Sequence, residues 1–211
     1  MGLRRVILAV PLGSTEQHGP HLPLDTDTRI AVALVACLAA ARDDVVAAPA
    51  LAYGSSGEHA GFPGTLSIGQ QALELVVVEL VRSADAYDGG VVLVNGHGGN
   101  VEPVARAART LDGEGRHVLA WSPSLPPGGD LHAGHTETSV MLALDPSAVR
   151  LDLAEAGATD VDVARLRAEG VRAVSPNGVL GDPAGASAAA GRALLDAMAA
   201  DLVSAVAAWT A

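Results

Sequence analysis

Residues 91–100 read VVLVNGHGGN, a short apolar run that ends in a polar, glycine-rich turn. The run Val91 to Val94 contains no polar residue, so both faces of a strand here would be apolar, which is typical of a strand buried on both faces. A helical pattern extends from the turn to about Leu111. The stretch therefore predicts one strand, turn and helix unit of an α/β fold, with His97 at the carboxyl end of the strand.

The same alternation of strand and helix recurs along the chain. Further strands are predicted at 6–11, 45–51 and 117–121, and further helices at 27–41, 66–87, 136–144 and 184–208. Ser67 and Gln70 are placed as a capping box for the helix at 66–87. Residues 147–177 show no clear pattern. We expect a single-domain, layered α/β/α fold with a mostly parallel central sheet.

Charge and composition exclude several classes of function. The chain has 211 residues, a net charge of -11 and no lysine, so all 13 basic residues are arginine. Without a lysine amine, a Schiff-base mechanism and the usual P-loop are excluded. The acidic balance argues against nucleic acid or an anionic membrane as a partner.

Location and assembly follow from other simple features. The single cysteine excludes a disulfide within the chain. Residues 1–11 do not resemble a signal peptide, and charges interrupt the long apolar run near the C-terminus. The sequence thus predicts a cytoplasmic protein. Its alanine-rich helical surface, unusual in so acidic a chain, predicts a homo-oligomer.

Five candidate metal ligands fall where a strand or loop gives way to a helix: Glu16, His18, Asp27, His97 and Glu137. Glu16 and His18 are two residues apart, so an extended backbone directs both side chains to the same face. Asp27 opens a helix, and its carboxylate can offer one oxygen to each of two cations. The set predicts two divalent ions per chain, which can activate a water and polarise a carbonyl. Oxygen and nitrogen ligands without a thiolate suit zinc, manganese or ferrous iron.

The remaining histidines and the glycine-rich turn have alternative interpretations. His117 is interpreted as an ordinary residue of a strand. His21 is either a hydrogen-bond partner of a ligand or a residue in direct contact with the chemistry. The glycines at 96, 98 and 99 could cradle a phosphate, but their spacing is not G-x-G-x-x-G and no lysine follows. We favour a turn that lets the backbone approach the metal site closely.

Four motifs together resemble those of the creatininase family of metal-dependent amidohydrolases. They are residues 11–28 (PLGSTEQHGPHLPLDTDT), 58–65 (EHAGFPGT), 95–100 (NGHGGN) and 132–139 (HAGHTETS). The resemblance spans roughly residues 6–145. It implies a layered α/β fold, two metal ions and hydrolysis of a C–N bond in an amide or cyclic amide.

The resemblance also implies roles for individual residues. By matching positions, Glu16, His18, Asp27 and His97 become metal ligands, with Asp27 bridging the two ions. Creatininase itself has a ligand glutamate two residues after the histidine of the turn, where this chain has Gly99. We expect Glu137 to supply the missing carboxylate, and the change argues against creatinine as the substrate.

His132 is implied as the proton shuttle that supplies the departing nitrogen with its proton. The alternatives are a further metal ligand or a structural residue. His59 is expected in the pocket wall. His135, like His21 and His59, is a candidate for contact with the substrate or with a metal ligand.

Residues 128–130 (GGD) and 178–183 (GVLGDP) resemble a peptidase branch of the family. That branch implies cleavage of a modified ribosomal peptide before its C-terminal Val-Tyr-derived unit, in the biosynthesis of a redox cofactor. The alternatives are a formamide hydrolase of the formamidopyrimidine deformylase type in flavin or deazaflavin biosynthesis, a creatinine amidohydrolase, and a metal-binding assembly protein without catalysis.

Overall fold

A parallel sheet of four strands forms the centre of the part of the chain that the structure describes, in the order β2-β1-β3-β4. The strands are β1 (Ile7–Leu12), β2 (Val45–Ala47), β3 (Gly90–Asn95) and β4 (Val118–Trp121). The computed structural model describes residues 5–124 and 129–211, so Gly128 of the GGD motif lies outside the described residues. The predicted parallel α/β architecture is confirmed.

Two central strands fix the position of the site. Every residue of β1 and of β3 is buried, as expected for strands covered on both faces. Their register pairs Ile7 with Gly90 and Leu12 with Asn95, so the two strands end level with each other. The segments that follow them therefore leave the sheet side by side.

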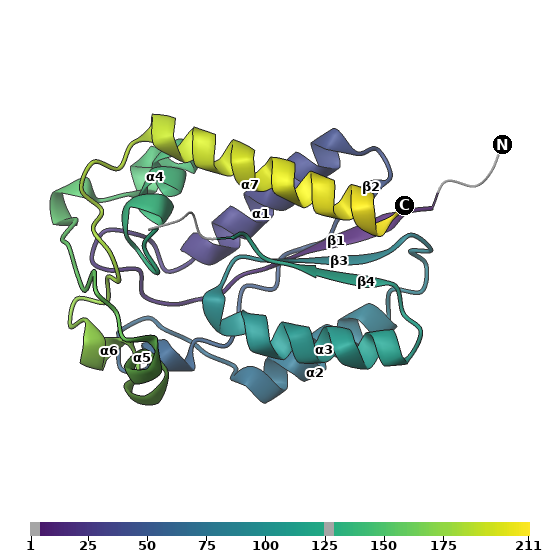
Figure 1. Ribbon diagram of the computed structural model, residues 1–211, viewed down its shortest axis with the longest axis horizontal. Helices are drawn as coiled ribbons and strands as arrows, with labels where there is room; N and C mark the ends of the chain where they lie inside the picture. Colours follow the sequence, from purple (N-terminus) through teal and green to yellow (C-terminus); the bar gives the residue numbers. More distant parts are fainter. Residues whose placement is uncertain (1–4, 125–128) are drawn as a thin grey trace.

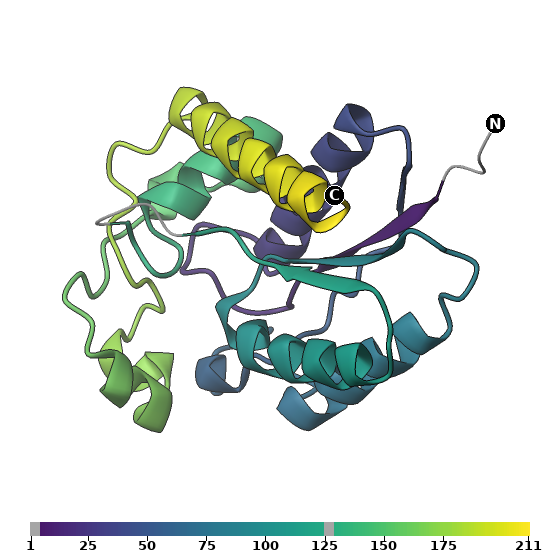
Figure 2. The ribbon, with the colours of Figure 1, turned by 45° about the vertical axis from the view of Figure 1, so that its right-hand side comes forward.

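Helices cover both faces of the sheet (Figures 1 and 2). On one face lie α1 (Thr26–Ala41), α4 (His135–Leu144) and α7 (Ala188–Trp209). On the other face lie α2 (Gln70–Arg82) and α3 (Val101–Gly113). Each layer has its own apolar cluster against the strands, one built around Leu34, Leu38 and Leu202 and the other around Leu73, Leu93 and Leu111. The layered α/β/α arrangement thus follows from helices whose apolar faces pack on a largely apolar sheet.

The helix predicted at 66–87 was wrong at both ends. Helix α2 begins at Gln70, not at 66, because the preceding residues are extended: Leu66 N–H donates to Thr15 O at 2.8 Å and Ile68 N–H to Gly54 O at 3.0 Å. Ser67 does not cap the helix; its hydroxyl accepts from Ser56 N–H at 2.9 Å. Helix α2 also ends at Arg82, short of the predicted Tyr87.

Two other predicted elements also differ. The helix predicted at 184–208 begins only at Ala188, after Ser187, whose side chain caps it. The strand predicted at 45–51 is shorter in the structure. β2 covers only Val45–Ala47, although Leu51 forms an isolated bridge with Leu12.

The region without a clear sequence pattern folds into short helices. They are η3 (Pro146–Ala148), η4 (Leu151–Leu153), α5 (Val163–Glu169) and α6 (Val171–Val174). α5 and α6 contact η1 (Gly57–His59), and η2 (Gly98–Asn100) precedes α3. In the described part of the chain, no helix is long and apolar enough to cross a membrane.

Candidate metal centre

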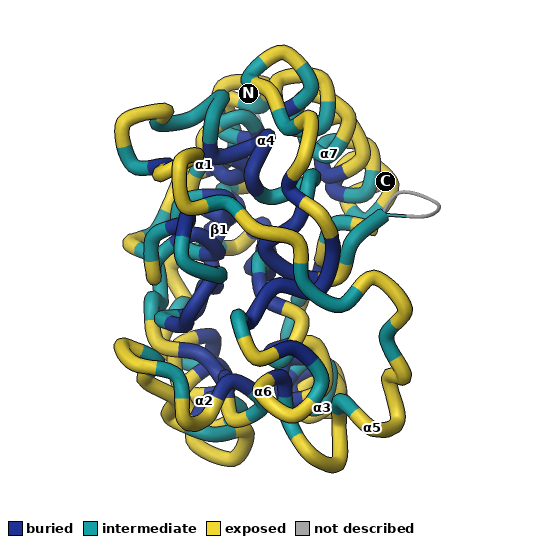
Figure 3. The backbone as a smooth tube through the Cα atoms, turned by 90° about the vertical axis from the view of Figure 1, so that its left-hand side faces the viewer, coloured by how far each residue is buried: buried dark blue, intermediate teal, exposed yellow. Residues whose placement is uncertain are grey.

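The five predicted ligands converge at the carboxyl ends of β1 and β3. Glu16 and His18 follow β1, His97 follows β3, and Asp27 and Glu137 lie in the first turns of α1 and α4. Four of them are buried, and the Glu137 side chain is 21% exposed. Viewed onto this edge of the sheet, the buried segments lie between the two helical layers (Figure 3). All five predicted ligands thus come together in one place.

Two glycines let the start of α1 approach the ends of the central strands. A Cβ at Gly13 would lie 2.5 Å from the Cα of Thr28, and a Cβ at Gly96 would lie 2.6 Å from the carbonyl oxygen of Asp27. Both distances are shorter than van der Waals contact, so any larger residue would push the helix away. The absence of side chains at these two glycines therefore allows Asp27 to lie between the segments that carry His18 and His97.

Asp27 is shared between two groups of possible ligands. Its Oδ1 lies 3.0 Å from His18 Nε2, and its Oδ2 lies 3.3 Å from His97 Nδ1. One group whose donor atoms lie within 4.8 Å of one another contains Asp27 with Glu16 and His97. A second contains Asp27 with His18 and Glu137.

The chemistry of this cluster fits divalent cations. Both carboxylate oxygens of Glu16 and Oδ2 of Asp27 are buried without a hydrogen-bond partner. Among the described residues, no lysine or arginine pairs with Glu16, Asp27 or Glu137; their cationic partners are histidines alone. Buried carboxylates without partners are costly unless cations coordinate them. The residues present therefore suit divalent cations.

The charges within the cluster are strongly coupled. Burial alone would lower the pKa of His18, but the attraction of Asp27, which accepts its hydrogen bond, raises that pKa to about 10. Burial lowers the pKa of His97 as well, yet Glu16 and Asp27 hold it well above its usual value. Burial would raise the pKa of Asp27, and the two histidines hold it well below its usual range. Without metal, the neighbouring carboxylates thus favour the protonated form of both histidines.

Glu137 is positioned by an unusual turn. Ala133 has φ 52, a left-handed conformation that is uncommon for alanine, and its N–H donates to Glu137 Oε2 at 2.6 Å. Burial, reinforced by the nearby Asp27 and opposed by His18, raises the pKa of Glu137 to about 7. The backbone before α4 thus holds this carboxylate toward His18, whose Nε2 lies 3.8 Å away.

His132 faces the same cluster with one ring nitrogen. Its Nε2 lies 2.8 Å from the backbone oxygen of Gln17, so Nε2 carries the proton and donates. Its Nδ1 lies 3.8 Å from Glu16 Oε1 and 4.0 Å from Glu137 Oε2. Burial and the charge of His18 hold the pKa of His132 well below its usual value, so the ring is neutral with Nδ1 free. Glu16, His18 and His132 also form a third group of possible ligands.

Of the four remaining histidines, two lie in or directly behind the site and two lie outside it. His59 belongs to the site: its Nε2 lies 3.3 Å from Glu16 Oε1, and burial lowers its pKa to about 4. His21 is buried behind the site, where its Nε2 lies 2.9 Å from the Thr138 hydroxyl. Neither of the other two is brought into the cluster: His135 is a half-buried residue at the start of α4, and His117 stacks on Trp209 at 3.9 Å.

Sequence patterns did not single out two residues that contact the site. Gln17 donates its amide to His59 Nδ1 at 2.8 Å and to Gly178 O at 3.1 Å, so it orients His59 while its backbone oxygen orients His132. Glu58 Oε1 lies 3.5 Å from His97 Nε2. The only signal for Glu58 was its place beside His59 in the second motif. Gln17 lies between Glu16 and His18 in the first motif, so an extended backbone would direct its side chain to the opposite face from theirs.

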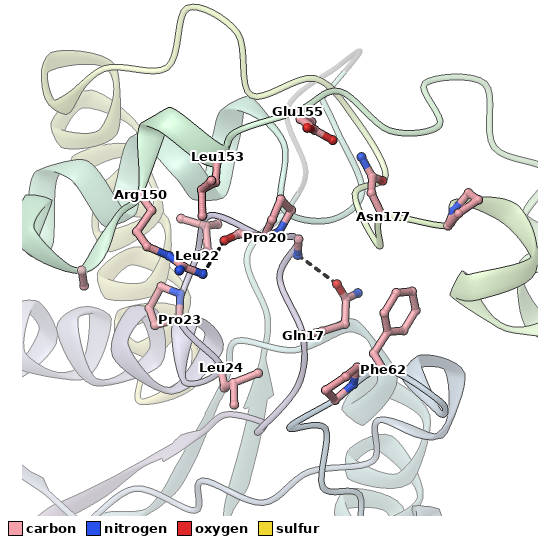
Figure 4. Close-up of a pocket in the computed structure, with 14 residues that line it drawn as sticks. Gln17, Pro20, Leu22, Pro23, Leu24, Phe62, Arg150, Leu153, Glu155 and Asn177 are labelled. Carbon is pink, nitrogen blue, oxygen red and sulfur yellow. Dashed lines mark hydrogen bonds between the residues drawn. The ribbon is translucent and has the colours of Figure 1, made fainter.

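Two cavities lie beside the cluster. An inner cavity of about 580 Å³ is lined by His97 and Glu137 and by apolar side chains, including Val101, Trp121 and Met198. An outer groove of about 680 Å³ is lined by Gln17, Phe62 and Arg150, among others. Figure 4 shows Gln17 between Pro20 and Phe62 among the residues that line this groove, and its Oε1 accepts from Gly19 N–H at 2.9 Å. Only the inner cavity is lined by candidate metal ligands.

Comparisons with known proteins agree on one family. The creatininase model, described as creatinine amidohydrolase, matches residues 3–206. A mycofactocin precursor peptide peptidase of Mycolicibacterium smegmatis is 52% identical over 200 residues, which cover 91% of this chain and 81% of that protein. One of Mycobacterium tuberculosis (strain ATCC 25618 / H37Rv) is 51% identical over 214 residues, covering 96% and 85%.

Solved structures give the same result. A structure described as "Creatininase Mn" superimposes with a TM-score of 0.77 at 28% identity, covering 96% of this chain and 90% of that one. A creatininase mutant of "Zn-Zn type" gives a TM-score of 0.76 at 29% identity, with coverage of 96% and 90%. Both descriptions name a divalent metal that was among the three expected from the ligand set.

Proposed function

Because the chain belongs to the creatininase family, as its motifs predict, we propose that it is a dinuclear metal-dependent amide hydrolase that cleaves a peptide. The proposed substrate is the modified mycofactocin precursor peptide, from which cleavage releases the C-terminal Val-Tyr-derived unit. The names of relatives about half identical to this chain support that substrate. The weaker match to a creatinine amidohydrolase of Pseudomonas putida, 34% identical over 175 residues, supports the broader reaction class.

One observation carries the metal part of the proposal: Asp27 belongs to two ligand groups at once. Glu16 and His97 would hold one ion with it, and His18 and Glu137 the other. Bound there, two divalent cations would polarise the scissile carbonyl and lower the pKa of a water. The ligand atoms do not favour zinc, manganese or iron over one another.

The chain's own groups would then manage the proton and the substrate. His132 begins neutral, with Nε2–H held by Gln17 O, so its Nδ1 is free to accept a proton and pass it to the leaving nitrogen. Gln17 keeps His132 and His59 in fixed tautomers and orientations. Amide cleavage needs such a donor, because without a proton the nitrogen would have to leave as an amide anion, which is a poor leaving group.

We place the part of the substrate next to the scissile bond in the inner cavity. This cavity shares His97 and Glu137 with the proposed metal centre, and its other walls are largely apolar. Apolar walls with a few polar groups at one end suit a bulky uncharged side chain held against the reacting bond.

The chain is further proposed to form a homo-oligomer. Three apolar side chains of α2 face solvent, with Leu75 60% exposed and Val76 and Leu80 also exposed. Covering such side chains in an assembly would bury apolar area. Light scattering of the metal-loaded protein at micromolar concentration should give a mass above that of one chain; a monomer would refute this part.

Product analysis tests the proposed activity. Metal-loaded protein is incubated with the modified precursor peptide, and the products are identified by mass spectrometry. We expect two fragments, the shorter being the C-terminal unit, and we expect none with Asp27→Asn or after chelation. An intact peptide with fully metal-loaded protein would reject the substrate, and release of formate from a formamidopyrimidine would favour the deformylase alternative.

A further inference from the structure

Gly99 leaves an opening that a carboxylate fills. A Cβ at this position would overlap the Oε1 of Glu58, the backbone oxygen of Ser55 and, at 2.5 Å, the Nε2 of His97. Glu58 comes from η1, far from Gly99 in the sequence, and its Oε1 lies 3.5 Å from His97 Nε2. The missing side chain at 99 is therefore what admits the carboxylate of Glu58 to this end of the site.

Glu58 has no other cationic partner among the described residues. Its side chain is 29% exposed, and its one ion pair is with His97. Its carboxylate shares the Nε2 of His97 with Glu16, whose Oε2 lies 3.2 Å from that nitrogen, and two negative charges so placed repel each other. A surface glutamate could turn toward water and avoid this cost, so its position beside two other acids calls for a compensating cation.

The charge count supports the same conclusion. Four carboxylates, those of Glu16, Asp27, Glu58 and Glu137, have only histidines as ion-pair partners within the described part of the chain. Two divalent cations and neutral histidines would balance the charge of four carboxylates. A balanced site is easier to keep in a partly buried pocket.

The spacing of the donor atoms is also suitable. Around a tetrahedral cation with bonds of about 2.1 Å, neighbouring donor atoms lie roughly 3.4 Å apart. Glu16 Oε2 lies 3.2 Å from His97 Nε2, and Glu58 Oε1 lies 3.5 Å from the same nitrogen. Glu58 is not within 4.8 Å of every donor in the Glu16, Asp27 and His97 group, so binding the same cation requires its partly exposed side chain to rotate toward that group.

We propose that Glu58 is a sixth ligand of the centre, holding the cation that Glu16, Asp27 and His97 bind. This inference rests on the proposed two-metal site. Its consequence is an asymmetric centre, with a fourth protein ligand at the His97 end and three ligands at the His18 end.

Stepwise titration of Zn²⁺ into metal-free protein, in competition with a chromogenic chelator, tests this assignment. Glu58→Gln keeps the shape of the side chain, and we expect it to bind one of two ions about 10- to 100-fold more weakly. Glu102→Gln is the matched control: it removes the same charge from an exposed position in the first turn of α3 and should bind both ions like the wild type.

Visible absorption of the Co²⁺-loaded proteins gives a second reading that depends on the ligands themselves. The spectrum of Glu58→Gln should differ from that of the wild type, whereas that of Glu102→Gln should not. Wild-type affinity for both ions together with an unchanged spectrum in Glu58→Gln would overturn the assignment while leaving the two-metal site intact. A wild-type protein that binds fewer than two ions would instead refute the proposed site itself.

Discussion

Asp27 contacts His18 with one carboxylate oxygen and His97 with the other, at 3.0 Å and 3.3 Å. The two histidines come from loops that follow different strands, and Asp27 lies at the helix start between them. A carboxylate placed in this way can bridge two cations, which is the basis for the first prediction.

Asp27→Ala should lose both ions, because each proposed ion has Asp27 as a ligand. The measurement is metal content after dialysis, by inductively coupled plasma mass spectrometry. Asp25→Ala is the control: Asp25 is two residues away and pairs with Arg29 rather than with the site. Wild-type metal content in Asp27→Ala would contradict the bridging role.

Glu137→Ala should weaken mainly one ion, since Glu137 belongs only to the group with His18 and Asp27. His97→Ala should weaken the other ion. Each variant is expected to retain about one ion per chain under conditions where the wild type retains about two. Loss of both ions by either variant would contradict the assignment of Glu137 and His97 to two different ions.

Metal affinity should increase with pH. Burial lowers the pKa of His18, but Asp27 outweighs burial and raises that pKa to about 10, so a cation must displace a proton at neutral pH. Each proton released makes binding about tenfold tighter per pH unit below that pKa. Titrations between about pH 6 and 9 in buffers of different ionisation enthalpy measure this release. An affinity independent of pH would contradict the release of a proton from His18 when the metal binds.

His132→Ala should keep its metals and lose roughly 100-fold or more in turnover of the peptide, the scale of a positioned acid or base. An activated ester or anilide needs little protonation of its leaving group, so its hydrolysis should suffer much less. Equal loss on both substrates with full metal content would assign His132 to positioning. Loss of metal would make His132 a ligand, in keeping with its place beside Glu16 and His18.

The sequence predicted the parts of the molecule where local pattern and tertiary structure agree. The apolar run at Val91 to Val94 identified a central strand, and the polar residues following β1 and β3 identified the site, because parallel strands end at one edge of the sheet. Of the glycines near His97, Gly96 lies against the backbone of Asp27 as predicted, whereas a Cβ at Gly98 would meet no atom within 4 Å.

The features that the sequence did not predict depend on contacts between distant segments. Leu66 and Ile68 are extended because their N–H groups bond to loops near Thr15 and Gly54, which overrides the helical pattern that follows. Glu58 approaches His97 only because Gly99 lacks a side chain. The spacing of residues within one segment does not predict a contact between two segments that are far apart in the sequence.

Anomalous diffraction from a crystal of the Mn²⁺-loaded protein would test the central claim most directly. We predict two peaks per chain, one beside Glu16, Asp27 and His97 and the other beside His18, Asp27 and Glu137. A single peak, or a peak among Glu16, His18 and His132 with none shared by Asp27, would contradict a two-metal centre bridged by Asp27.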